Sequence, residues 1–203
     1  MYQEASETLC ADDALGALVE RHGPLRLDPS DDLYRRLVVS ILRQQVSMAS
    51  AEATRERLFD VVEVTPEEVL AAEEGTLRDA GLSRQKTRYV RAAAETFIAE
   101  GYEKADFAEM ADEAIVGTLT GITGVGEWTA RMQLLFTFGR PDVFPVGDLG
   151  VRKGMWALFD ESLSRAEMIE EAKRWEPYRS YASLYLWRVE EDIAASVAEV
   201  HET

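Results

Sequence analysis

The sequence predicts an all-α protein with two helical lobes. Apolar residues recur at helical spacing along the chain, and no convincing segment shows the period of two that a strand requires. Capping residues followed by Pro or acidic residues separate these apolar segments, which is typical of helix starts. A glycine-rich turn near the middle of the chain leads directly into an apolar segment, as expected for two helices joined by a tight hairpin.

Helix starts in the first half are recognised by their capping residues. A Ser, Thr or Asp side chain can accept a hydrogen bond from the free N–H groups of a first turn, and Pro is well suited to the first helical position. Ser30 followed by two acids, Thr65 followed by Pro66, and Ser83 carry this signal. We expect helices that start at Ser30, Thr65 and Ser83, the last of them ending at Gly101, and a further helix over residues 48–61.

The second half is predicted to contain the hairpin and several further helices. Asp106 is expected to cap a helix that ends near Leu119. The hairpin covers about residues 117–138, and Pro141 and Pro145 mark the irregular connection that follows it. We expect helices over 127–138, 149–159, 164–175 and 178–199, a central lobe over 30–140, and a second lobe from 1–29 plus 141–203.

The composition excludes several classes of protein. No run of eighteen apolar residues exists, so no transmembrane segment is predicted, and the acidic N-terminus shows no export signal. The single Cys10 excludes an internal disulfide, a four-cysteine iron–sulfur cluster and a multi-cysteine zinc site. His22 and His201 are too far apart in sequence to suggest a histidine metal site. A prokaryotic, nucleoid-associated cytoplasmic protein is expected.

The charge is strongly acidic but unevenly distributed. The net charge is −16, and of the 22 basic residues only four are Lys, which leaves 18 Arg. Such a composition is typical of a protein that works in concentrated salt, where the Debye length falls to about 3 Å near 1 M, although an ordinary acidic cytosolic protein is the alternative. Residues 81–91 carry four basic residues and no acid. One face could therefore meet a polyanion.

The Gly124-Val125-Gly126 turn predicts a phosphate-binding cradle. Both glycines permit a positive φ and a close approach of the backbone to a ligand. The helix behind them offers unpaired N–H groups and the positive end of its dipole, so the cradle needs no Lys or Arg. Arg84 and Lys86, together with Arg88, are further candidate phosphate contacts, with a solvated helix face as the alternative.

Five motifs resemble the HhH-GPD superfamily of base-excision DNA glycosylases, and they follow one another along the chain in the order found in that family. Residues 119–130 (LTGITGVGEWTA) resemble its helix-hairpin-helix, and residues 142–152 (DVFPVGDLGVR) resemble its Gly/Pro-rich loop with an Asp. Residues 40–47, 81–89 and 175–187 are similar to the 3-methyladenine DNA glycosylase II (AlkA-like) branch. The resemblance covers about residues 10–190 and implies a two-lobed helical fold with the active-site cleft between the lobes.

The resemblance implies hydrolysis of the bond between a damaged base and deoxyribose. Asp148 occupies the family's catalytic position, where a carboxylate stabilises positive charge on the sugar and helps to activate water. Taken alone, an Asp before Leu-Gly-Val-Arg could simply cap the next helix, and the two roles can coexist.

Position 128 separates two mechanisms within the resemblance. Bifunctional relatives of the endonuclease III type have a Lys there, which attacks the sugar through a Schiff base, whereas this chain has Trp128. We therefore expect a monofunctional enzyme that leaves an abasic site. A bifunctional glycosylase/lyase and a non-catalytic helix-hairpin-helix DNA-binding module are the alternatives.

The resemblance also implies an aromatic base pocket suited to cationic alkylated purines such as 3-methyladenine and 7-methylguanine. Trp128 and Trp187 stand at pocket positions, Tyr178 is a nearby candidate, and Met132 replaces a residue that is aromatic in some relatives. Tyr181 and Tyr185 are more simply explained as core residues.

Two further features follow from the resemblance. Gln45 stands at the position of the side chain that fills the gap left by the flipped base; Gln44 more simply supports the turn, although either could be a polar helix end. The carbonyl groups of Thr120, Ile122 and Val125 correspond to those that hold a monovalent Na+ or K+ ion next to a DNA phosphate. No cofactor is required, no iron–sulfur cluster or membrane is involved, and the expected partner is damaged double-stranded DNA bound by a monomer.

Overall fold

The structure, a computed structural model, describes residues 1–189. All regular secondary structure within these residues is helical, as predicted, and no helix among them is both long and apolar enough to cross a membrane. The chain divides into two compact units. Residues 29–138 form one of them, called here the continuous unit, and residues 1–28 join the chain from residue 139 onward to form the split unit.

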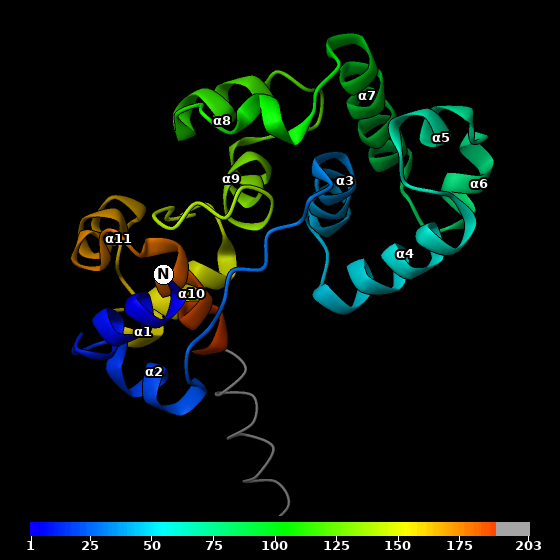
Figure 1. Ribbon diagram of the computed structural model, residues 1–203. Coiled ribbons are helices and arrows are strands. Elements are labelled where there is room, and N and C mark those ends of the chain that lie inside the picture. Colours follow the sequence, from blue (N-terminus) through cyan, green and yellow to red (C-terminus); the bar gives the residue numbers. More distant parts are fainter. Residues whose placement is uncertain (190–203) are drawn as a thin grey trace, which may run out of the picture. The chain divides into compact units, whose positions relative to one another are not determined.

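The continuous unit is built around a central helix, α3, whose residues are buried on most sides. Helices α7 and α9 pack against α3, and α5 lies against α7 (Figure 1). The hairpin helices α8 and α9 pack against each other. The elements of this unit are α3 (Leu33–Arg43), α4 (Met48–Val61), α5 (Pro66–Ala71), α6 (Glu74–Asp79), α7 (Arg84–Glu100), the 3₁₀ turn η1 (Lys104–Phe107), α8 (Asp112–Thr120) and α9 (Glu127–Phe136).

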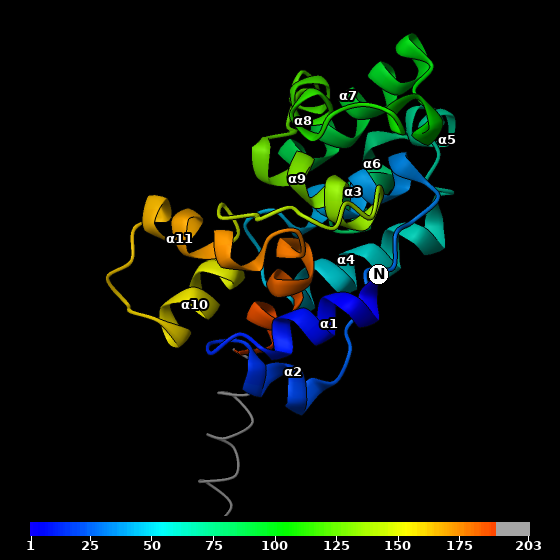
Figure 2. The ribbon, with the colours of Figure 1, turned by 60° about the vertical axis from the view of Figure 1, so that its left-hand side comes forward.

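The split unit gathers both ends of the chain around one apolar core. Trp175 and Tyr185 are almost fully buried in this core, and Tyr181 is 5% exposed, so the prediction that these two tyrosines are core residues is confirmed. Helices α1 and α2 lie side by side (Figure 2). The elements are α1 (Tyr2–Cys10), α2 (Gly16–His22), α10 (Leu149–Leu158), α11 (Arg165–Ala172) and the 3₁₀ turn η2 (Lys173–Trp175). Residues 179–189 form a further helix.

The capping predictions for Thr65 and Ser83 are confirmed. Thr65 accepts a hydrogen bond from Glu68 N–H, and Ser83 accepts one from Lys86 N–H. Helix α7 ends at Gly101, which adopts the left-handed conformation (φ +64°) that favours glycine after a helix. The rest of the helix predicted over 178–199 lies outside the described residues.

Three boundary predictions were wrong. Asp32, not Ser30, caps α3, because its carboxylate is the one that reaches Arg35 N–H at 2.8 Å. Asp106 lies within η1 and accepts from Glu103 N–H, so it does not cap α8. Helix α9 ends at Phe136 instead of residue 138.

The sequence analysis also missed α1, α2 and α6. None of these three helices has a side chain that caps its first turn. Since the helix starts were read from capping residues, helices held by packing alone gave no such signal.

Candidate functional site

The hairpin turn of the continuous unit, residues 121–126, is anchored by two apolar side chains. Ile122 is 2% exposed and Val125 is 5% exposed, whereas Thr123 and Gly126 lie at the surface. The backbone N–H of Val125 donates to the carbonyl of Ile122 at 3.0 Å, which closes the turn. The side chains of Ile122 and Val125 thus hold the turn in the core, and the residues that follow each of them present their backbone to solvent.

The two glycines of this turn have different roles, and only Gly124 adopts the positive φ that both residues permit. Gly124 has φ +91°, and a Cβ on it would lie 2.1 Å from Cγ of Tyr89, so the ring of Tyr89 occupies the space that glycine leaves. Gly126 has φ −91°, an ordinary extended conformation, and a Cβ there would meet nothing within 4 Å. Neither the backbone conformation nor packing explains why residue 126 is a glycine, whereas the close approach of a ligand to the backbone would explain it.

The start of α9 directly follows Gly126. No side chain caps this helix, so the N–H groups of its first turn are not satisfied by a side-chain cap. The first-turn acid Glu127 is paired with Arg131 at 3.0 Å, which offsets its charge next to the helix start. These features suit the binding of an anion.

A second turn of the same unit, residues 44–47 between α3 and α4, contacts the hairpin. The side-chain amide of Gln44 donates to the Gly124 carbonyl at 3.0 Å and to the Thr129 hydroxyl at 2.9 Å. Gln45 is exposed and has φ +56°, the left-handed region that non-glycine residues rarely adopt. Gln44 is therefore engaged within the protein, whereas Gln45 presents its side chain to solvent.

Two of the three basic residues predicted to contact phosphate, Arg84 and Lys86, differ in environment. Arg84 is exposed on the first turn of α7. Lys86 is partly buried, and its ammonium group donates to the Leu42 carbonyl near the end of α3 at 2.6 Å. Burial lowers the pKa of Lys86. The contact with Leu42 gives Lys86 a structural role, because it satisfies one of the last carbonyl groups of α3.

In the split unit, Asp148 caps α10. One oxygen of its carboxylate, Oδ1, accepts hydrogen bonds from Val151 N–H at 3.0 Å and from the indole N–H of Trp187 at 2.8 Å. A Cβ on Gly150 would lie 2.7 Å from Cδ1 of Trp187, so only glycine lets the indole come this close to α10. The cap and the indole together fix the orientation of the carboxylate.

The loop that leads to Asp148 is held by the helix that starts at residue 179. Arg179 makes two hydrogen bonds to the carboxylate of Asp142, at 2.7 and 2.8 Å, and this pairing raises the pKa of Arg179. The hydroxyl of Ser180 accepts from Val143 N–H and donates to the Arg140 carbonyl. The backbone before Asp148 is thus fixed by contacts with residues almost forty positions later in the sequence.

The sequence matches one protein family over residues 38–179, described as HhH-GPD superfamily base excision DNA repair protein. This segment contains the turn at Gln45, the hairpin and Asp148. The chain belongs to the HhH-GPD superfamily.

Relatives within this superfamily match most of the chain. The Bacillus subtilis protein YfjP is 34% identical over 189 residues, which cover 86% of this chain and 65% of YfjP. The Schizosaccharomyces pombe 3-methyladenine DNA glycosylase Mag1, solved in complex with abasic DNA, has a TM-score of 0.86 and 27% identity over 93% of this chain and 97% of Mag1. A DNA-3-methyladenine glycosidase from Bacillus halodurans has a TM-score of 0.78 and 30% identity over 95% of this chain and 91% of its own.

The four predicted pocket residues of this HhH-GPD chain lie in both units. Trp128 is partly buried near the start of α9, and Met132, one turn later, is 5% exposed. Trp187 contacts Asp148 directly. The ring of Tyr178 lies 6.2 Å from that of Tyr181. Burial is the main cause that raises the pKa of Tyr178, and a hydrogen bond with Glu4 of α1 raises it further.

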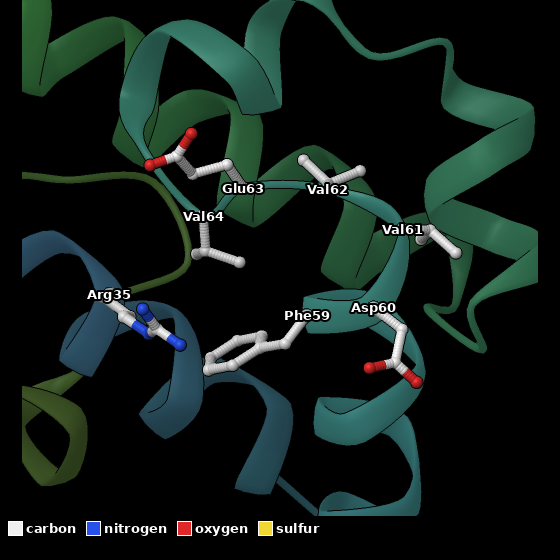
Figure 3. Close-up of a pocket in the computed structure, with 7 residues that line it drawn as sticks. All are labelled: Arg35, Phe59, Asp60, Val61, Val62, Glu63 and Val64. Carbon is white, nitrogen blue, oxygen red and sulfur yellow. The ribbon is translucent and has the colours of Figure 1, made fainter.

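A pocket of about 310 Å³ contains none of the predicted HhH-GPD site residues. It lies in the continuous unit, between Arg35 of α3 and residues 59–64 at the end of α4. Figure 3 shows the Asp60 and Glu63 carboxylates pointing away from each other, and Arg35 lies over the Phe59 ring at 4.4 Å. This arrangement brings no pair of acids together in the pocket.

Several supporting residues of the HhH-GPD site were not found from the sequence. Tyr89, Gly150 and Arg179 act through contacts with residues 35 to 37 positions away, and no local pattern marks them. The segments that contain Tyr89 and Arg179 were recognised, but the partner of each residue was not.

Proposed function

We propose that the protein is a monofunctional DNA glycosylase of base excision repair that removes alkylated purines from double-stranded DNA. The observation that carries this proposal is the carboxylate of Asp148, fixed through Oδ1 by Val151 N–H and the Trp187 indole. Membership of the HhH-GPD superfamily supports DNA repair as the setting, and the likeness to Mag1 and to the B. halodurans enzyme supports alkylated bases as the substrate class.

The role of Asp148 follows from the charge that develops during the reaction. The bond between C1′ and the base breaks with its electron pair leaving on the base, so a cationic base such as 7-methylguanine departs neutral and the sugar becomes positive. The Asp148 carboxylate stabilises this positive charge. Water then bonds to C1′ and gives up a proton, which the carboxylate accepts and passes to solvent. The product is an abasic site.

The continuous unit supplies the grip on DNA. The exposed backbone at Gly126 and the first turn of α9 bind a phosphate of the damaged strand. Arg84, the first residue of α7, adds a charged contact with DNA. The carbonyl groups of Thr120, Ile122 and Val125 would hold a Na+ or K+ ion that bridges the hairpin to a DNA phosphate. They suit such an ion because a carbonyl oxygen has two lone pairs, and the one hydrogen bond that Ile122 accepts uses only one of them. No other cofactor is needed.

Base flipping and recognition use exposed and aromatic side chains. Gln45 fills the gap in the duplex. Trp128 and Met132 of the continuous unit, and Trp187 and Tyr178 of the split unit, are the proposed contacts of the flipped base. Trp128 stands where a lyase would need an amine, so the enzyme leaves the strand uncut. One protein molecule acts on one lesion.

Replacing Asp148 with Asn tests this proposal. The amide oxygen of Asn can still accept from Val151 N–H and from Trp187, so the fold and the cap of α10 should persist. We expect release of 7-methylguanine from duplex DNA to fall about 10³-fold, because the charge that stabilises the sugar is gone, while DNA binding stays equal or improves. Release is measured as strand breaks that form only after treatment with alkali.

Asp160→Asn is the matched control. Asp160 lies in the same unit, and its carboxylate also accepts hydrogen bonds, which come from the backbone N–H and the hydroxyl of the nearby Ser162. Its replacement should leave base release unchanged. Unchanged release by Asp148→Asn would overturn the catalytic role, breaks without alkali would indicate a lyase, and binding without any release by the unaltered protein would indicate a DNA-binding module.

A further inference from the structure

The turn that carries Gln45 and the turn that carries Gly124 are joined through one side chain. Gln44 belongs to the first turn, and its amide group donates to the Gly124 carbonyl at 3.0 Å and to the Thr129 hydroxyl at 2.9 Å. Both acceptors belong to the hairpin: one in its turn, the other in the first turn of α9. The residue next to the proposed wedge is therefore tied to the backbone proposed to hold the phosphate.

The other contacts of these two turns make the connection stiff. Both polar groups of the peptide between Gly124 and Val125 are hydrogen-bonded. The Gly124 carbonyl accepts from the Gln44 amide, and the Val125 N–H donates to the Ile122 carbonyl. The Tyr89 ring packs where a side chain on Gly124 would be, and Lys86 of the same helix, α7, donates to the Leu42 carbonyl just before the wedge turn. A displacement of the hairpin is therefore transmitted to the turn.

The conformation of Gln45 shows that the turn is held under strain. Among the described residues it is the one non-glycine residue with a positive φ, at +56°. A left-handed conformation is unfavourable for an ordinary L-residue, so neighbouring contacts must maintain it. Gln44 precedes Gln45 directly and is extended (ψ 125°), and its side chain makes the described long-range contacts of this turn.

We propose that Gln44 is a positioning residue that couples the grip of the hairpin on the damaged strand to the insertion of Gln45 into the duplex. This inference rests on the proposed function. Gln44 touches neither the sugar nor the leaving base. It holds Gln45 in the conformation that enters the gap when the hairpin binds the phosphate, so flipping depends on it and bond breaking does not.

The test compares two substrates with the same enzyme preparation. One duplex carries 7-methylguanine opposite cytosine, and the other carries it unpaired in a one-nucleotide bulge, where little energy is needed for flipping. For Gln44→Ala we expect single-turnover release from the paired substrate to fall about tenfold, equivalent to about 1.4 kcal/mol at 25 °C. Release from the bulge should stay within about twofold. A loss of folded protein affects both rates equally and cancels in their ratio.

Gln44→Glu supplies a readout that a purely structural role would not move. A carboxylate has no hydrogen to donate to the Gly124 carbonyl, whereas the protonated acid has one. The paired-substrate rate of Gln44→Glu, divided by that of the unaltered enzyme, should therefore rise as the pH falls from about 7.5 toward about 5, nearer the ordinary glutamate pKa of about 4.3.

Gln85→Ala is the matched control. Gln85 is an exposed glutamine of α7 that donates to the Tyr89 hydroxyl at 2.6 Å, and its loss should leave both rates unchanged. Equal losses on the two substrates for Gln44→Ala, or a pH-independent ratio for Gln44→Glu, would overturn the coupling role alone. No release by the unaltered enzyme from either substrate would overturn the proposed function, and this inference with it.

Discussion

The hairpin and the Asp148 loop position their functional groups by opposite means. The hairpin presents backbone atoms, held by the buried side chains of Ile122 and Val125 and by the close packing of Tyr89 on Gly124. The Asp148 loop presents one side chain, oriented by residues 37 to 39 positions later, such as Arg179 and Trp187. The hairpin should therefore be most sensitive to changes in backbone conformation, and the acid loop to changes in side-chain contacts.

The largest effect is expected for Gly124→Ala. Its Cβ would lie 2.1 Å from the Tyr89 ring, at a φ of +91° that a residue with a side chain rarely adopts. Displacement of the ring together with backbone strain should lower the free energy of unfolding by about 2–4 kcal/mol. Urea denaturation measures this loss, and DNA binding should be lost with it.

Gly126→Ala is the control in the same turn. A Cβ at Gly126 meets nothing within 4 Å, and φ is −91°, so the stability should change by no more than about 0.5 kcal/mol. DNA affinity should still fall about tenfold, because the methyl group blocks the backbone from approaching a phosphate. Equal destabilisation by the two substitutions would contradict the different roles assigned to these glycines.

The next largest effect is expected for Gly150→Ala. The new Cβ would lie 2.7 Å from the Trp187 ring and 3.2 Å from Asp148 Oδ1, so the indole must move away from the carboxylate. A displacement of about 1 Å at a reacting group can reduce turnover about 10²-fold, and we expect a loss of that size in base release. DNA binding should be almost unchanged, since the hairpin lies in the other unit.

Leu149→Ala tests whether this effect depends on the indole. Leu149 is the neighbour of Gly150 and is 52% exposed, so its truncation removes little packing. Base release should stay near that of the unaltered enzyme. A similar loss for both substitutions would indicate that the start of α10 is generally sensitive and would contradict the role given to the Gly150–Trp187 contact.

The same contrast explains which features the sequence could predict. Thr65, Ser83 and the hairpin glycines act through neighbours within a few residues, so a local pattern was enough to recognise them. The contact of Tyr89 with Gly124 depends on the tertiary fold, and no spacing rule brings these two residues together. Asp148 was predicted from its surrounding motif, but the indole that orients it was assigned only to the base pocket.

The different conformations of the two hairpin glycines show a similar limit. A Gly-Val-Gly sequence allows a positive φ at both glycines, but a single left-handed residue is enough to reverse the chain here. The second glycine was therefore available for a different purpose, close approach by a ligand. The missed helices α1, α2 and α6 show the same limit, because packing and not a local cap determines where they start.

The smallest effect concerns the frame that supports the hairpin. Tyr34 of α3 is 4% exposed and donates a hydrogen bond to the Val90 carbonyl of α7 at 3.0 Å. Burial raises the pKa of its hydroxyl well above the ordinary value of 10.0. The folded state therefore keeps this proton at a pH where the unfolded chain loses it, so the stabilisation is complete below pH 10.0 and declines as the pH rises above it.

Tyr34→Phe should cost about 1 kcal/mol near neutral pH and make the decline above pH 10.0 shallower, as measured by urea denaturation across that range. If both proteins lose stability equally steeply at high pH, the contact between α3 and α7 does not depend on this hydroxyl, and the support of the hairpin must come from apolar packing alone.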